Sequence, residues 1–268
     1  MFGFGSSKSV VGLDIGSSSI KAVELKKVKG EVHVAHLGIE QLGSDIVVDS
    51  MIVDSGSVSS AISKLFSDRK FGSKLVATAV SGHSVIVKKI SMQTVPENEV
   101  PGLLQTEAAQ YIPFDMNDVN IDYQVLTDDA NEPQMDVLLA AVKKDKILNY
   151  TNVLSLAGKI PAVVDIDAFA LQNCYEYNYE PSPSSTVALL NLGASVMNIN
   201  IVKGSTPLFT RDVSVGGNQY TDSLQKELDL SFEDAESLKL GAKVGTVSQD
   251  AKLPILKQVT EIIVLEIQ

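Results

Sequence analysis

The first third of the chain alternates apolar and polar positions in a way that is typical of strands. This pattern predicts strands over residues 9–15, 20–28, 31–42, 74–82 and 83–92. One segment differs, because residues 57–66 repeat apolar side chains at helical spacing after a serine-rich start. The first three strands follow one another through short turns, so we expect them to form a meander.

The middle of the chain predicts a separate α/β module. A helix is expected over 96–112, since acidic residues lie near its start and the ring of Pro113 disfavours helix at the residue before it. Further elements are a helix over 144–158, which ends at Gly158, and strands over 119–126, 135–144 and 161–166. Helix, strand, strand, helix and strand would make a compact insertion.

Helices and strands alternate again in the last third. Residues 167–178 predict a helix with Asp167 as its N-cap, and 180–186 is the clearest linker in the chain. A strand–turn–strand unit over 187–205, a strand over 208–215 and helices from 217, over 231–241 and over 252–268 follow. The last helix stops without a cap, so we expect a chain truncated at its C-terminus.

Composition narrows the class of protein. With 268 residues, of which 44% are hydrophobic and 21% charged, the chain predicts a globular protein with a sizeable core. A net charge of -11 argues against nucleic-acid binding and against direct adhesion to an anionic membrane. A single cysteine excludes an internal disulfide, and the chain has neither a secretory signal nor an apolar run long enough for a membrane span. We therefore expect a cytoplasmic protein.

One sequence motif occurs twice. "LDIGSSSIKAVEL" aligns with "LNLGASVMNINIV" at a constant offset of 177 positions. The offset pairs the first-copy residues Asp14, Gly16, Ser17 and Ser18 with Asn191, Gly193, Ala194 and Ser195 of the second copy. A strand–turn–strand unit on both sides of a linker predicts two similar lobes that each present a glycine turn to a shared cleft.

Each turn has the chemistry of a phosphate site. Gly16 lets the backbone approach a phosphate, consecutive N–H groups bind anions, and the hydroxyls of Ser17, Ser18 and Ser19 add donors. Asp14 would orient a hydrated Mg²⁺, and Lys21 would neutralise phosphate charge. The alternative is a plain β-hairpin in which Asp14 caps the turn and Lys21 is solvated. No GxxxxGK[ST] is present, so the site is not a P-loop.

These residues resemble the actin-like ATPase superfamily. The two copies resemble its phosphate motifs, and "DVSVGGNQYTDSL", with Gly216 and Gly217, resembles the double-glycine segment after the second. "DAESLKLG" resembles its adenosine-contacting helix, where Glu236 and Lys239 would approach ribose and base; an ordinary surface ion pair is the alternative. The resemblance implies a two-lobed α/β fold of the actin-like ATPase (ribonuclease-H-like) class that binds ATP or ADP with Mg²⁺.

A narrower resemblance is to the PilM family of type IV pilus assembly. The residues that carry it are "TEAAQYIPFDMNDVNIDYQVL", "MDVLLAAVKKDKI" and "AGKIPAVVDIDAFAL". The family has an FtsA-type subdomain inserted in its first lobe. We therefore expect a first lobe over 1–83 and 163–183, an inserted subdomain over 84–162 and an incomplete second lobe over 184–268.

The family resemblance implies a cytoplasmic, ATP-binding scaffold. Such proteins bind the N-terminal cytoplasmic peptide of the inner-membrane protein PilN, which ties them to the inner membrane and to the other membrane and motor components of the pilus. Membrane contact would run only through partners, and self-association is implied by the fold. No catalytic residue is assigned, because the amide of Asn191 replaces the usual aspartate and disfavours fast hydrolysis. The alternative is an FtsA-like filament former or an actively hydrolysing ATPase.

Overall fold

The first lobe is built on a mixed five-stranded sheet. A computed structural model describes residues 9–126 and 132–268. The strand order is β10 (Ile160–Ile166), β6 (Leu75–Val80), β1 (Val11–Ile15), β2 (Ser19–Val28) and β3 (Glu31–Gln41). The strands β1, β2 and β3 pair antiparallel in sequence order, which confirms the predicted meander, whereas β6 runs parallel to both β1 and β10.

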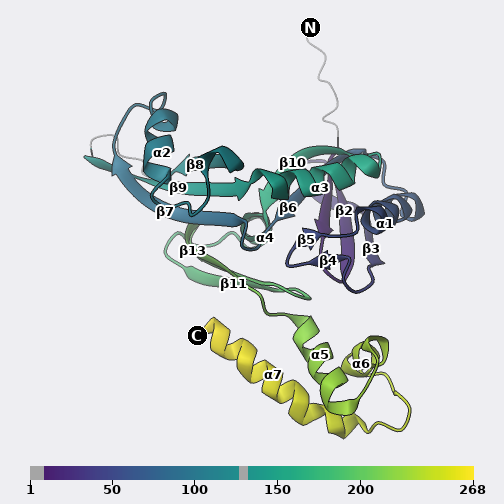
Figure 1. Cartoon of the computed structure of the whole chain (residues 1–268). Coiled ribbons are helices and arrows are strands. Elements are labelled where there is room, and N and C mark those ends of the chain that lie inside the picture. The colour runs from purple at the N-terminus through teal and green to yellow at the C-terminus, as the bar shows by residue number, and fades with distance from the viewer. Residues whose placement is uncertain (1–8, 127–131) are drawn as a thin grey trace.

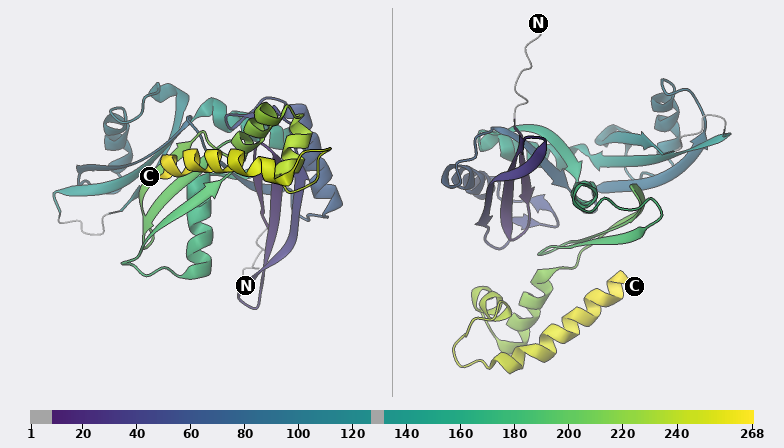
Figure 2. Two further views of the ribbon diagram at one scale, coloured as in Figure 1. Left: turned by 90° about the horizontal axis from the view of Figure 1, so that it is seen from below. Right: turned by 180° about the vertical axis from the view of Figure 1, so that it is seen from behind.

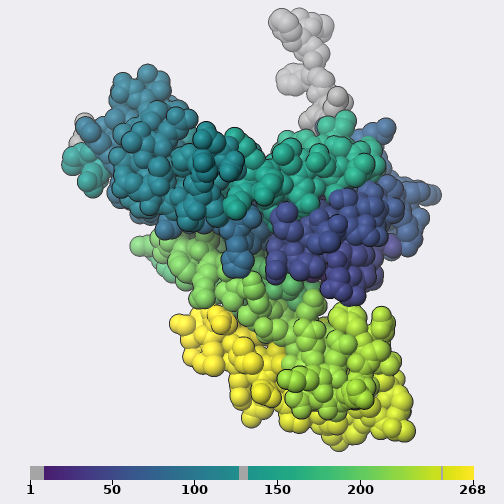
Figure 3. All heavy atoms as spheres, in the orientation of Figure 1, coloured from purple at the N-terminus to yellow at the C-terminus, as the bar shows by residue number. Residues whose placement is uncertain are grey.

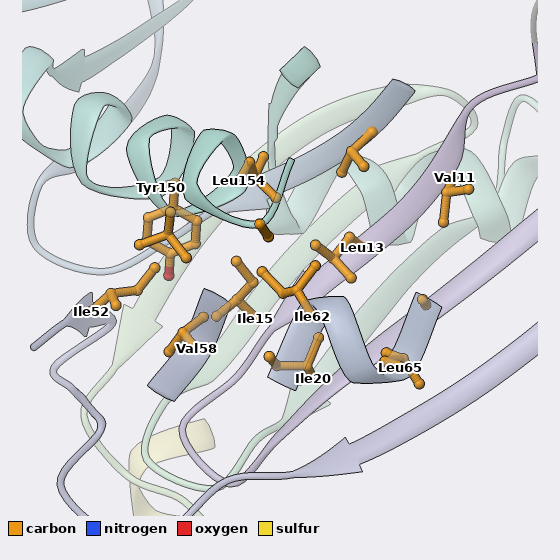
Figure 4. Packing of buried hydrophobic residues seen from close by; sticks show 14 of the residues in the cluster. Val11, Leu13, Ile15, Ile20, Ile52, Val58, Ile62, Leu65, Tyr150 and Leu154 are labelled. Carbon is orange, nitrogen blue, oxygen red and sulfur yellow. The ribbon is translucent and has the colours of Figure 1, made fainter. Parts of the chain in front are cut away.

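Two helices cover one face of this sheet (Figure 1). They are α1 (Ser55–Asp68), whose first turn is capped by the Asp54 carboxylate, and α3 (Lys144–Leu156). Figure 4 shows Val58, Ile62 and Leu65 of α1 and Tyr150 and Leu154 of α3 converging on the side chains of β1. A short hairpin, β4 (Val47–Val48) and β5 (Met51–Ile52), completes this core. Strands of two residues carry no periodicity, so the pattern of the sequence did not predict them.

A second sheet forms the inserted module. Its strand order is β7 (Val85–Gln93), β9 (Gln134–Lys143) and β8 (Val119–Val125). The helix α2 (Val100–Ala108) packs on it, the 3-10 turn η1 (Met116–Asp118) precedes β8, and the module has a hydrophobic core of its own. In the space-filling view this module stands out to one side of the first lobe (Figure 3).

The predicted boundary of the insertion needs correction at its C-terminal end. The predicted insertion over 84–162 includes residues 144–162, yet α3 contributes Tyr150, Val153 and Leu154 to the core of the first lobe. β10 pairs in parallel with β6 and is therefore an edge strand of the first sheet. We therefore propose that the inserted subdomain covers about residues 84–143.

The second lobe repeats the meander of the first. After α4 (Asp167–Tyr179) come β11 (Thr186–Leu192), β12 (Met197–Lys203) and β13 (Thr206–Val213), which form an antiparallel sheet. The helices α5 (Gly217–Leu228), α6 (Phe232–Lys239) and α7 (Lys252–Ile267), with the short turn η2 (Gln249–Ala251), follow. Two views show these helices grouped beyond the sheet (Figure 2), and Val259 and Ile263 of α7 pack against β12 and β13.

Two predicted helix starts are wrong. The helix expected over 96–112 is α2, which begins only at Val100 because Pro101 occupies its first turn and fits only there. Asp167 is not an N-cap, since Ile166 holds that position and Asp167 is the first helical residue. Its carboxylate is therefore free to point elsewhere. Among the described residues no helix is long and apolar enough to cross a membrane.

Candidate functional site

The sequence repeat is also a structural repeat. The N–H of Gly16 donates to the carbonyl of Ser19 at 3.1 Å, and that of Gly193 donates to the carbonyl of Val196 at 3.0 Å, so both turns close in the same way. Just before each turn, Asp14 pairs across the strands with Lys21, and Asn191 with Asn198. The same backbone frame therefore carries an ion pair in one lobe and an amide pair in the other.

The two turns face each other across the lobes. The Ser17 hydroxyl lies within hydrogen-bonding distance of the Ser195 hydroxyl. Around this contact is a small cavity of about 90 Å³, lined by parts of both lobes; its polar lining includes Asp14, Ser17, Ser18, Lys21, Ser50, Ser81, Tyr150, Asp167, Asn191, Ser195 and Asn198. The predicted phosphate residues of the two copies are thus brought together in one place.

Asp14 and Lys21 form a half-exposed ion pair. The Lys21 ammonium donates to Asp14 Oδ2 at 2.8 Å, and the two side chains are 49% and 56% exposed. An exposed pair of this kind adds little to stability, typically up to about 1 kcal/mol. Lys21 is therefore not a free solvated residue, and the pair places a cation and a carboxylate together at the cavity.

The double glycine fastens the second turn to α5. The N–H groups of Gly217 and Asn218 donate to the carbonyls of Gly193 and Ala194 at 2.9 and 2.7 Å. A Cβ at Gly216 would lie 2.5 Å from both of those carbonyl oxygens. Glycine is required at 216 by this close approach and not by its backbone angles, because its φ of -170° is ordinary extended backbone.

Glu236 and Lys239 form an ion pair on the surface of α6, and this pair also lines the wall of a cleft. Lys239 Nζ lies 2.5 Å from Glu236 Oε2, and both contact Thr221 Oγ1 of α5, at 3.0 and 2.6 Å. A wide cleft of about 770 Å³ extends from the two turns to these residues and is also lined by Asp222, Gln225 and Phe232. Its volume is in the range of small-ligand sites.

The other wall of the cleft is the β4–β5 hairpin, which α3 holds in place. Two donors, the buried Lys146 ammonium and the Tyr150 hydroxyl, reach the carbonyl of Ser50 at the hairpin tip. The side chain of Asn149 bonds the backbone of Ile52 on both sides, at 3.0 and 2.9 Å. Because burial disfavours the ammonium form, it lowers the pKa of Lys146 to about 8.

Asp167 is a functional candidate that the sequence analysis missed. It lines the small cavity from the start of α4. Burial raises its pKa to about 6, the Ser81 hydroxyl opposes this, and the nearby Asp14 and Asp212 carboxylates add to it. The signal in the sequence was an acid close to the end of a strand, as at Asp14, but a helix cap explained it equally well.

The donor set fits a magnesium nucleotide better than a bare metal ion. Among the described residues no group of three or more His, Cys, Asp or Glu side chains could hold a metal. Mg²⁺ usually binds through one or two carboxylates with water and phosphate oxygens as its other ligands. Asp14 can supply such a carboxylate, and the glycine and serine turns can supply donors for phosphate.

A second concave region lies where the inserted module meets the first lobe. This groove, of about 480 Å³, is lined by five consecutive β8 residues (120–124) and by Val164, Asp165 and Ile166 of β10. Leu138, Ala140, Val142, Ile147 and Phe169 supply its apolar floor and sides. β8 and β10 are both edge strands of their sheets.

Comparison with solved structures shows the fold. A PilM–PilN type IV pilus biogenesis complex matches with a TM-score of 0.85 at 23% identity, over 96% of this chain and 75% of that one. The ethanolamine utilization protein EutJ from Carboxydothermus hydrogenoformans matches at 0.55, with 18% identity over 98% and 71%. MreB5 of Spiroplasma citri bound to AMPPNP matches at 0.53, with 13% identity over 98% and 78%. The predicted actin-like ATPase fold is confirmed.

Comparison with protein families goes further than the fold. The family model described as type IV pilus assembly protein PilM matches residues 12–268. This range contains both glycine turns, the inserted module and α6, so the narrower resemblance, to the PilM family, is confirmed in addition to the broader one. The chain belongs to the PilM family of type IV pilus assembly proteins.

Proposed function

We propose that this chain is a nucleotide-dependent scaffold of type IV pilus assembly, which binds ATP or ADP with Mg²⁺ between its lobes and holds a partner peptide in the groove. One observation carries the nucleotide part. Two equivalent glycine turns, one from each lobe, meet at the Ser17–Ser195 contact beside a cleft large enough for a nucleotide. Donors from both lobes could then bind the phosphates of one nucleotide from two sides.

Each side of the cleft has its own task in this proposal. The turns donate to phosphate oxygens, and bound nucleotide would bring Mg²⁺, whose charge Asp14 balances. Lys21 moves from Asp14 towards phosphate, since its half-exposed ion pair costs little to break. Glu236 and Lys239 line the far end of the cleft, where they would contact ribose and base. The Lys239 side chain is only 19% exposed.

The groove supports an extended peptide as the partner. The edges β8 and β10 present backbone N–H and C=O groups that an added strand can pair with. The apolar floor takes alternate side chains, and Asp122 and Asp165 in the lining favour a positively charged segment or a free N-terminus. The match to a PilM–PilN complex supports PilN as the partner, and we propose its N-terminal cytoplasmic segment as this peptide.

Nucleotide and peptide sites are close enough to influence each other. Ile166 lines the groove, and its neighbour Asp167 lines the phosphate cavity. A change in the position of the β10–α4 junction on nucleotide binding would alter both sites, and the resulting coupling would be reciprocal.

The peptide site can be tested by filling the groove. Ala140→Phe places a ring on the groove floor, and we expect it to weaken binding of a synthetic PilN N-terminal peptide at least tenfold, measured by fluorescence anisotropy. Ser60→Phe adds the same ring to the outer surface of α1 and is the matched control. Equal peptide affinity in both variants would place the peptide elsewhere.

Slow ATP hydrolysis is the second candidate function, and Asp167 is the observation that favours it. A carboxylate with a pKa of about 6 inside the phosphate cavity is suited to accept a proton at neutral pH. Asn191, at the position equivalent to Asp14, has no such capacity. We propose Asp167 as the general base of any hydrolysis that this chain performs.

A further inference from the structure

We propose that Asn198 and Asp212 are positioning residues, which fix the amide of Asn191 so that its carbonyl oxygen, and not its NH₂ group, faces the phosphate cavity. The inference rests on the proposed nucleotide site and adds a determinant of its metal dependence. Neither residue was singled out by the sequence, and neither needs to touch the nucleotide.

A chain of hydrogen bonds connects the three side chains. Asn191 Nδ2 donates to Asn198 Oδ1 at 2.8 Å, and Asn198 Nδ2 donates to Asp212 Oδ1 at 2.7 Å. Asn198 is only 3% exposed, so water does not offer its amide an alternative partner. We call these three side chains the amide relay.

The direction of the amide relay follows from chemistry alone. A carboxylate has no proton to donate, so Asn198 must turn its NH₂ group towards Asp212. The amide oxygen of Asn198 then points to Asn191. Because this oxygen is an acceptor, Asn191 must donate to it from its own NH₂ group. Each amide is thus oriented by the carboxylate of Asp212 at the far end of the relay, a residue that does not itself line the cavity.

The consequence appears at the cavity that Asn191 lines. Because the Nδ2 end of the Asn191 amide points to Asn198, the Oδ1 end, an acceptor, is the end left to face the cavity. An acceptor favours a hydrated cation or a water molecule and opposes a bare phosphate oxygen. Position 191 therefore presents the same hydrogen-bonding character as the carboxylate of Asp14 at the equivalent position, without its charge.

The amide relay also ends on the other lobe. Asp212 Oδ2 accepts the N–H of Gly82 at 2.6 Å, and Gly82 lies between β6 and β7, at the root of the inserted module. Both oxygens of Asp212 are used, one in each lobe. The orientation of the Asn191 amide is therefore tied to the arrangement of the lobes as well as to Asp212.

Exchanging the carboxylate and the amide tests this logic. In Asp212→Asn the new amide satisfies Gly82 and Asn198 only if the whole amide relay inverts, which turns the NH₂ group of Asn191 into the cavity. Asn191→Asp alone puts acceptors at both ends, and Asn198 cannot donate to both. The double variant Asn191→Asp/Asp212→Asn moves the acceptor to the cavity end and satisfies every bond.

Asp68→Asn, at the exposed end of α1, removes the same charge as Asp212→Asn and is the control.

The nucleotide-free protein gives the first readout. We expect thermal unfolding midpoints near wild type for Asp212→Asn, a drop of roughly 5 °C for Asn191→Asp, and recovery in the double variant. A double variant at least as unstable as Asn191→Asp would overturn the proposal. This readout does not depend on nucleotide binding.

The second readout is the ratio of ATP affinity with Mg²⁺ to that with EDTA. We expect Asp212→Asn to lower this ratio about tenfold and the double variant to restore it. An unchanged ratio in Asp212→Asn, equal to that of Asp68→Asn, would overturn the role of the amide relay. Wild-type protein without ATP affinity would instead contradict the proposed function, while the unfolding cycle still decides on the relay.

Discussion

Asp14 and Asn191 occupy equivalent strand ends in the two lobes but carry different charge. Asp14 is balanced by Lys21, whereas Asn191 is held by a neutral amide. In the proposed site the first lobe would therefore exchange its cation between carboxylate and phosphate, and Asn191 of the second lobe would contribute a neutral oxygen. The proposal thus places the charge balance of a bound Mg²⁺ on the first lobe.

The first residue-scale prediction concerns Asp14. We expect Asp14→Ala to abolish Mg²⁺-dependent ATP binding and to change the free energy of unfolding by less than about 1 kcal/mol, because its ion pair is half exposed. Titration calorimetry with and without Mg²⁺, beside a urea melt, measures both effects. Wild-type Mg²⁺-ATP affinity in this variant would remove Asp14 from the metal site.

The second residue-scale prediction concerns Asp167 and pH. Its pKa of about 6 in the folded state exceeds the usual 3.9 of an unfolded aspartate. Between these values the folded carboxyl keeps a proton that the unfolded chain has lost, so stability falls as the pH rises from about 4 to 6. Asp167→Asn should remove this fall and should gain up to about 3 kcal/mol at pH 7.

Urea melts at pH 4, 6 and 7 measure the stability effect of Asp167→Asn. Any ATP hydrolysis by the wild type should decrease as the pH falls through 6, because Asp167 then becomes protonated, and the variant should not hydrolyse ATP. A variant that is less stable than wild type at pH 7, or that keeps its turnover, would contradict the assignment.

At the scale of elements, the second turn is held in place by hydrogen bonds from the backbone at the start of α5. We expect Gly216→Ala to destabilise the protein by several kcal/mol and to abolish ATP binding, since its Cβ would meet two carbonyl oxygens at 2.5 Å. Gly102→Ala is the matched control, because nothing lies within 4 Å of a Cβ there and α2 should gain up to about 1 kcal/mol. Similar unfolding midpoints for the two variants would show that the close approach at 216 is not required.

Most elements follow from local pattern, and the exceptions have physical causes. The meander of β1, β2 and β3 alternates regularly, and α1 shows a serine-rich start and apolar residues at helical spacing, so both were predictable. The hairpin of β4 and β5 depends on donors from α3, which lies far away in the sequence. The assignment of β10 to the first sheet depends on strand pairing, which periodicity does not encode.

The candidate site divides in the same way. Turn residues such as Gly16 and Gly193 were predictable because a duplicated motif identifies them in the sequence. Asp167, Asn198 and Asp212 were not, because each belongs to the site only through contacts between segments that are distant in the chain. From the neighbouring sequence alone, a local structural role explains an acid or an amide at these three positions as well as a role in the site does.

At the scale of the whole molecule, the proposed function places two recognition regions on one scaffold. The proposed nucleotide cleft lies between the lobes, and the proposed peptide groove lies between the first lobe and the inserted module. At the junction of β10 and α4, Ile166 lines the groove and its neighbour Asp167 lines the small cavity between the two turns. In the proposal, this arrangement would allow a partner held in the groove to sense the nucleotide state without contacting the nucleotide.

We propose that the two glycine turns form one magnesium-nucleotide site, and titration of the chain with ATP in the presence and absence of Mg²⁺ would test this site. We expect saturable binding with one ATP per chain, competition by ADP and a marked loss of affinity in EDTA. Absence of saturable binding, or an affinity that does not depend on Mg²⁺, would contradict the proposed site.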